Sequence, residues 1–261
     1  MLSSALVAGA VATAAPAQAA PTVNMEAVVK AAQWDPYKPD QSITPGAGDS
    51  VKAVEQALAA KDMLASRYVD GHFGTTTIDG YAKYQRSLGY SGLDASGLPG
   101  KTSLAKLGDG RYTLSNTLSV GARSTMDGET VNARTAAMIK EAEGKAGENL
   151  TLTQGSYTSE TGASAGTHDG GGAVDISISG VSDVDGTVTA LRQVGFAAWH
   201  RTPAQGFDHH IHAVAISDTD MSPEAQAQIG DYYKGLNGLA GHGADDGPQV
   251  AKVTWEEYKR S

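Results

Sequence analysis

The segment THDGGGAVDI (Thr167–Ile176) and the segment GFDHHIHAVAI (Gly206–Ile216) decide how this chain is interpreted. The chain has seven histidines, and three of them, His209, His210 and His212, fall within four positions. Apolar and polar residues alternate in HIHAVAI, which predicts a strand. Such a strand points His210 and His212 to one face and His209 to the other.

The two segments together indicate a metal site. A catalytic zinc site has three nitrogen or oxygen ligands from the protein and one open position. A glycine turn followed by a short strand can return the Asp175 carboxylate to the His168 imidazole. Either segment alone has a simpler explanation, because a histidine before glycines is commonly a loop residue and an aspartate often caps a strand. Both segments in a chain without cysteine favour metal.

HDGGGAVD resembles the H-x-x-G-x-A-x-D signature of the zinc D-alanyl-D-alanine carboxypeptidase family, which is grouped with the lysostaphin-type peptidases and the hedgehog fold. The fixed positions of that signature are occupied by His168, Gly171, Ala173 and Asp175. The resemblance covers roughly residues 128–217. It implies Zn²⁺ bound by His168, Asp175 and His212, and a peptidase that cleaves D-alanyl-D-alanine or a nearby stem or cross-bridge bond of peptidoglycan.

The catalytic base has three candidates. Family members often carry serine two residues before the first histidine, where this chain has Gly166, and an acidic residue three before the last ligand, where it has His209. His210 is favoured because it shares a strand face with His212. Asp208 is the second candidate, and His209 becomes the base only if a bulge reverses the alternation.

Three further residues are candidates for the cleft. Gln154, on a strand expected before the first ligand, is a candidate hydrogen-bond donor to substrate, although a glutamine at a strand edge is also commonly solvated. Trp199 and Phe207 are candidates either for the cleft wall or for the core.

Residues 49–108 are expected to form three helices. The segments VEQAL, DGHFGTTT, YQRSLGY and GLPGKTSLAKL resemble, in order and spacing, the peptidoglycan-binding domain of wall hydrolases. The resemblance implies attachment to wall glycan or stem peptides. A helical spacer that no longer binds is the alternative, since turn glycines preserve a fold with or without binding.

The second half alternates helices with locally paired strands, which predicts an α+β fold with a small antiparallel sheet over residues 128–236. Its expected helices are GETVNARTAAMIKEAEGKAG, TVTALRQVG and SPEAQAQIGDYYKGL. Residues 21–48 and 109–127 are expected to be linkers. Residues 237–261 are expected to be a surface extension that leaves His242 in solvent.

Composition restricts the environment and the partners. The 261 residues carry a formal charge of −9 and a pI near 5.2, which argues against nucleic acid as a partner. Cysteine is absent, so disulfides and thiolate chemistry are excluded. Residues 1–20, alanine-rich and ending in small residues, predict a signal peptide, although no lysine or arginine precedes Lys30.

We therefore expect a secreted, wall-associated zinc peptidase that is monomeric and free of the membrane once the signal is removed. The alternative is a wall-binding protein whose peptidase-like domain keeps its metal without catalysis.

Overall fold

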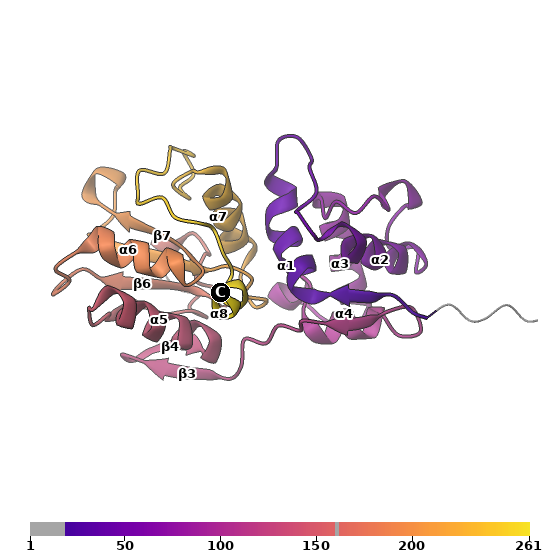
Figure 1. The fold of residues 1–261 in the computed structure, drawn as a ribbon, viewed down its shortest axis with the longest axis horizontal. Helices are drawn as coiled ribbons and strands as arrows, with labels where there is room; N and C mark the ends of the chain where they lie inside the picture. Colours follow the sequence, from indigo (N-terminus) through magenta and orange to yellow (C-terminus); the bar gives the residue numbers. More distant parts are fainter. Residues whose placement is uncertain (1–18, 160–161) are drawn as a thin grey trace, which may run out of the picture.

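The computed structural model describes residues 19–159 and 162–261, which form a helical lobe and a sheet lobe side by side (Figure 1). Most of the predicted signal peptide, residues 1–18, lies outside the described residues. Within the described ranges, no helix combines the length and apolar character needed to cross a bilayer. Helices and small antiparallel sheets together make the chain α+β.

The helical lobe is built from four α-helices and a two-stranded parallel sheet. Its elements are β1 (Thr22–Asn24), α1 (Met25–Trp34), η1 (Asp35–Tyr37), α2 (Gly48–Ala59), η2 (Ser66–Tyr68), α3 (Thr75–Ser87), η3 (Gly92–Ala95), α4 (Lys101–Leu107) and β2 (Thr113–Ser115). Val51, Val54 and Leu58 recur at helical spacing on α2 and are fully buried. The three helices expected within residues 49–108 are thus present as α2, α3 and α4, and α1 is an addition.

The sheet lobe contains a four-stranded antiparallel sheet in the order β5-β6-β8-β7. Its elements are β3 (Arg123–Met126), β4 (Glu129–Asn132), α5 (Ala133–Ala146), β5 (Leu152–Gln154), η4 (Gly162–Ser164), β6 (Ala173–Ser177), α6 (Val184–Gln193), β7 (Phe196–Arg201), η5 (Pro203–Gln205), β8 (His210–Ala215), α7 (Pro223–Lys234) and α8 (Trp255–Arg260). Helices α5 and α6 cover one face of the sheet, and α7 packs on the other (Figure 1). The strands expected around the two histidine segments are confirmed.

Two segments predicted to be linkers are regular structure instead. Helix α1 lies within residues 21–48; the Asn24 side chain caps its first turn, and Met25, Val28 and Val29 are fully buried. Strands β2 and β3 lie within residues 109–127. The helix predicted from Gly128 begins only at Ala133, because residues 129–132 pair with β3 as strand β4.

Helix α1 joins the two lobes into one body. A single cluster of buried apolar side chains runs from α1 and α2 through α7 to the sheet. At this junction the Trp34 and Tyr233 rings stack with centroids 4.5 Å apart, and the Gln33 amide accepts from the Ser217 N–H and donates to the Asp218 carbonyl. The two lobes therefore pack directly against each other and are not joined by a flexible linker alone.

The C-terminal segment is a packed part of the sheet lobe, so the prediction of a surface extension is wrong. Asp245 forms a buried ion pair with Arg192 at 2.8 Å. Helix α8 places Glu256 against Arg134, also at 2.8 Å. His242 is largely exposed, as expected, and its Nδ1 lies 2.9 Å from an Asp231 oxygen.

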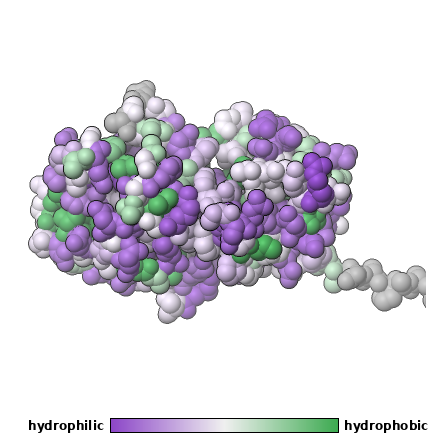
Figure 2. Space-filling view, turned by 90° about the horizontal axis from the view of Figure 1, so that it is seen from above, coloured by the Kyte–Doolittle hydropathy of each residue, from purple (hydrophilic) through white to green (hydrophobic). Residues whose placement is uncertain are grey.

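The surface carries little contiguous apolar area. Figure 2 shows two largely hydrophilic lobes with only small apolar patches on the face in view. Among the described residues, the large hydrophobic side chains that are well exposed are Ile43 and Leu93.

Glu55 on α2 is a fully buried carboxyl in the helical lobe. Its oxygens accept from the N–H groups of Asp70 and Gly71 and from the Thr77 hydroxyl, which holds the DGHFG turn against α2. Burial raises the pKa of Glu55 to about 7, although these hydrogen bonds act in the opposite direction. The folded lobe therefore keeps a proton that the unfolded chain loses at about pH 4.5.

We expect Glu55→Gln to stabilise the protein increasingly as the pH rises from 5 to 8. Ionisation of the buried carboxyl costs on the order of 1–3 kcal/mol above its folded pKa, and the neutral amide avoids this cost. Denaturant unfolding at pH 5 and pH 8 measures the difference from wild type. Asp79→Asn, an exposed charge removal on α3, is the control. A difference independent of pH would contradict the assignment.

Candidate metal centre

Three predicted ligands come together at one point of the sheet lobe. One ligand atom each of His168, Asp175 and His212 lies within 4.8 Å of the others, and this group could hold a metal ion. An Asp175 Oδ1 atom is 3.4 Å from His168 Nε2 and 2.7 Å from His212 Nδ1. Asp175 and His212 face each other because they are register partners on β6 and β8.

The turn before β6 is packed so closely that only glycines fit. A Cβ at Gly170 would lie 2.3 Å from the Asp220 carbonyl oxygen. A Cβ at Gly171 would meet the Tyr157 hydroxyl at 2.7 Å and Asp218 Oδ1 at 3.0 Å. The close packing fixes the backbone that carries His168, whose side chain is buried.

Both imidazoles are oriented through the nitrogen that faces away from the centre. His168 Nδ1 donates to the Gly155 carbonyl oxygen at 2.8 Å, which directs Nε2 toward Asp175. His212 Nε2 donates to Gln228 Oε1 at 2.8 Å, and Gln228 Nε2 donates to the Gly238 carbonyl at 3.0 Å. Such outer hydrogen bonds are typical of metal-ligating histidines.

The electrostatics of the group fit a shared cation. Burial opposes ionisation of Asp175, but hydrogen bonds from His168 and His212 outweigh it and hold the pKa of the carboxyl well below its usual range. Burial lowers the pKa of His212 despite the neighbouring carboxylate. A bound cation would replace the hydrogen bond between His212 and Asp175. His212, neutral and protonated at Nε2, would then ligate the cation through Nδ1 beside the Asp175 carboxylate.

The three candidates for the base occupy different positions. His210 Nδ1 donates to the Asp208 carbonyl oxygen at 2.7 Å, and its Nε2 lies 3.7 Å from Asp175 Oδ1. The Asp208 side chain is exposed at the pocket rim. His209 lies instead against His200, with ring nitrogens 3.2 Å apart. Of the three, His210 has a ring nitrogen aimed at the centre.

The remaining candidate residues for the cleft either line the same pocket or are buried beside it. Gln154 lines the pocket, and its amide donates to Ser164 Oγ at 2.9 Å and Thr158 Oγ1 at 3.2 Å. Gln154 would therefore reach a substrate only by exchanging one of these bonds. Trp199 is buried and stacks on His212, whereas Phe207 lines the pocket.

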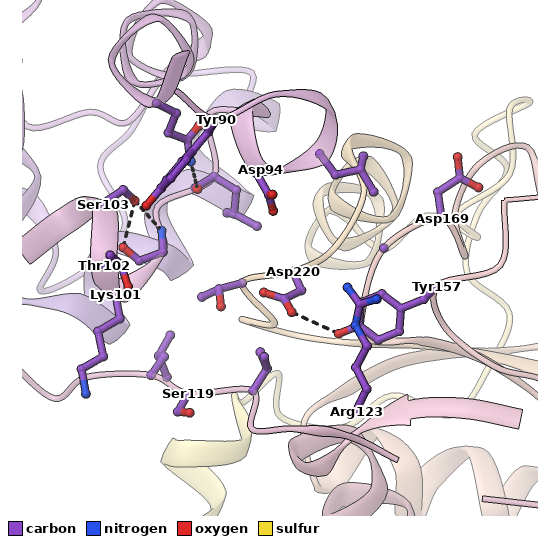
Figure 3. A pocket seen from close by; sticks show the side chains of 18 residues that line it. Tyr90, Asp94, Lys101, Thr102, Ser103, Ser119, Arg123, Tyr157, Asp169 and Asp220 are labelled. Atoms are coloured by element: carbon purple, nitrogen blue, oxygen red, sulfur yellow. Dashed lines mark hydrogen bonds between the residues drawn. The ribbon is translucent and has the colours of Figure 1, made fainter. Parts of the chain in front are cut away.

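The metal group opens into a pocket of about 790 Å³, a size suited to a peptide segment. A second cavity, of about 690 Å³, lies between the lobes (Figure 3). Tyr90 and Lys101 of the helical lobe face Tyr157 and Asp220 across it, and the Tyr157 hydroxyl donates to Asp220 at 3.1 Å. Asp169 lines this second cavity, so the turn that carries His168 forms a wall of both.

Comparison of the chain with protein-family models, curated proteins and solved structures finds no match.

Gln228 on α7 is a residue of the centre that sequence reasoning missed. A glutamine within the helix PEAQAQIGDYYK carries no local signal, because its role depends on α7 packing across the sheet. Arg201 also lines the pocket, and its position could have been predicted from the sequence. Alternation along FAAWHR places it on the same face as Trp199.

We expect Gln228→Ala to weaken metal binding by about 10- to 100-fold, because His212 loses the acceptor that fixes its ring and tautomer. Competition with a metal chelator measures the affinity. Gln226→Ala is the matched control on the same helix; it removes a 2.8 Å bond to the Ala32 carbonyl and should lower stability without altering metal affinity. Equal affinities in wild type and Gln228→Ala would contradict this role.

Proposed function

We propose that the protein is a secreted zinc-dependent peptidase of peptidoglycan, which cleaves D-alanyl-D-alanine or a nearby stem or cross-bridge bond. The observation that carries this proposal is the group of two buried imidazoles, His168 and His212, and the partly buried Asp175 carboxylate, which opens into a peptide-sized pocket. Two imidazole nitrogens and one carboxylate oxygen form a ligand set that suits zinc. The wall substrate rests on the resemblance of the two sequence motifs.

A zinc ion held by these residues would supply Lewis-acid chemistry, polarising the peptide carbonyl and making an attacking water more acidic. The protein must supply the proton transfers. His210 suits this task because its Nδ1 is anchored by the Asp208 carbonyl, which leaves Nε2 to accept a proton beside the metal group. The same nitrogen can then pass the proton to the leaving amine.

The helical lobe supports the wall substrate through its own motifs. A binding unit attached to a catalytic unit raises the effective concentration of substrate at the pocket. Here the attachment is rigid, since α1 packs against α7. The binding surface would therefore keep a constant orientation to the pocket.

The second candidate function is a wall-binding protein that keeps the metal without catalysis. The observation in its favour is the position three residues before His212, where no acidic side chain is present. His209 stands there, and its ring pairs with His200. Measurements of metal content and of cleavage separate the two functions.

We expect purified protein to contain about one zinc per chain and to release D-alanine or a defined fragment from peptidoglycan stem peptides. His168→Ala should lose both the zinc and the cleavage. Metal analysis and mass spectrometry of the digests measure these outcomes, and His242→Ala, far from the ligand group in sequence and largely exposed, serves as the matched control. Zinc without cleavage would favour the second candidate, and absence of zinc from wild type would refute both.

We expect His210→Gln to lower kcat by about 10²- to 10⁴-fold with zinc content unchanged, as loss of a general base does. Asp208→Asn should have a small effect, because it retains the backbone carbonyl that anchors His210. Steady-state kinetics with metal analysis distinguishes the two variants. A larger loss in Asp208→Asn than in His210→Gln would transfer the role of base to Asp208.

A further inference from the structure

Two histidines outside the ligand group face each other near the end of β7. His200 Nε2 and His209 Nδ1 are 3.2 Å apart, and the ring centroids are separated by 5.3 Å. The His209 side chain is exposed, and the His200 side chain is partly exposed. Neither belongs to the group of His168, Asp175 and His212. The pair therefore offers two metal-binding nitrogens that the proposed reaction does not use.

Strand register explains why these two rings meet. Strands β7 and β8 are antiparallel neighbours, and His200 pairs with Ile211, two residues after His209. His200 and His209 are therefore diagonal neighbours across the two strands, a separation that long side chains can bridge. Ile211 is buried on the face covered by α5 and α6, and paired residues share a face. The pair thus lies on the side of the sheet opposite the metal pocket, although the same two strands build both.

The separation of the two nitrogens matches that of two ligands on one metal ion. A tetrahedral zinc lies about 2.0–2.1 Å from each imidazole nitrogen, so two such nitrogens are about 3.3 Å apart. His200 Nε2 and His209 Nδ1 are already 3.2 Å apart. In their hydrogen bond, one ring donates a proton to the lone pair of the other. A divalent ion would replace that proton and accept a lone pair from each ring, after a rotation that the exposed His209 side chain can make.

The surroundings of His200 favour a metal cation. Burial and the neighbouring His209 lower the pKa of His200, so this imidazole is neutral at neutral pH and can act as a ligand. The carboxylates of Asp185, in the first turn of α6, and Asp246 both act on it with negative charge. Both aspartates and His200 line a small cavity of about 140 Å³. A metal ion at the pair is attracted by these two carboxylates.

We infer that His200 and His209 form a second metal site, which binds a divalent transition-metal ion such as Zn²⁺ or Cu²⁺. Imidazole nitrogen suits both ions, and water takes the remaining positions. Because this site has two protein ligands and the first group has three, its ion binds less tightly and is lost when the protein is dialysed. The site goes beyond the proposed function, since it requires neither substrate nor cleavage.

An ion at the second site would hold the loop between β7 and β8 against β7. Phe207 and Asp208 of this loop line the metal pocket, and the Asp208 carbonyl anchors His210. His209 lies between Asp208 and His210, so fixing its ring restrains the wall of the pocket from the opposite side of the sheet. The Phe207 N–H donates to the Thr202 carbonyl at 3.2 Å and therefore reports opening of the loop.

Calorimetric titration with Zn²⁺ tests the site in protein that already holds its first zinc. Wild type should bind a second, weaker equivalent, and His200→Ala and His209→Ala should each lose it. His168→Ala should retain the weaker equivalent, because only the first group is broken. His242→Ala is the matched control, since it removes an exposed histidine that pairs with a carboxylate, and it should bind as wild type does. One equivalent in wild type, or a second equivalent unchanged in His209→Ala, would overturn the site.

Hydrogen exchange tests the effect on the loop. With Zn²⁺ at about ten times the Kd of the second site, exchange of the Phe207 amide should slow about 10-fold in wild type and stay unchanged in His209→Ala. Equal exchange with and without the second equivalent would show that the ion does not hold the loop. Failure of the proposed function is distinguishable: a second equivalent without peptide cleavage would refute the peptidase and leave this site standing.

Discussion

The antiparallel pairing of β6 with β8 is the constraint on which the rest of the site depends. It sets Asp175 opposite His212 and Ser177 opposite His210. A shift of one residue would turn every one of these side chains to the apolar face beneath α5 and α6. The register is held because Val174, Ile176, Ile211 and Ala213 are fully buried on that opposite face. Packing on one side of the sheet thus fixes chemistry on the other.

Much of this site could be predicted from the sequence, because strand alternation is a local rule. HIHAVAI indicates which histidines share a face, and the glycine run indicates a turn that returns Asp175 to His168. The placement of Gln228 could not be predicted, since it comes from α7, which reaches the ligands only through tertiary packing. Arg201 obeys the same alternation as His210, but its burial becomes visible only when all neighbouring side chains are in place.

The errors in predicting the fold from the sequence have a similar origin. The segment MEAVVKAAQW has apolar residues at helical spacing, with Asn24 as its cap, yet it lies within residues 21–48, which were expected to be a linker. The loop that follows this helix is held by the buried Asp35 carboxylate, which accepts from Lys38, from Thr44 and from the Phe73 N–H of a distant turn. A loop stabilised by contacts far along the chain resembles a flexible one when only its composition is considered.

A buried polar network links the position of His168 to the body of the sheet lobe. The Asn132 side chain caps α5 and also donates to Asp218 at 2.7 Å. Burial raises the pKa of Asp218, so the hydrogen bonds that it accepts from Asn132 and from the Asp220 N–H matter all the more for keeping the site in one arrangement. The glycines after His168 pack directly against this network.

The same turn is also a wall of the cavity between the lobes, where Asp169 and Gly170 line the opposite side from His168. Its backbone is held there by the Asp220 carbonyl, which accepts from the Gly171 N–H at 2.8 Å. Residues 118–120, which lead from one lobe to the other, line that cavity as well. The ligand geometry therefore depends on the packing between the lobes as well as on the sheet. The rigid junction at α1 thus helps to hold the metal-ligating residues in place.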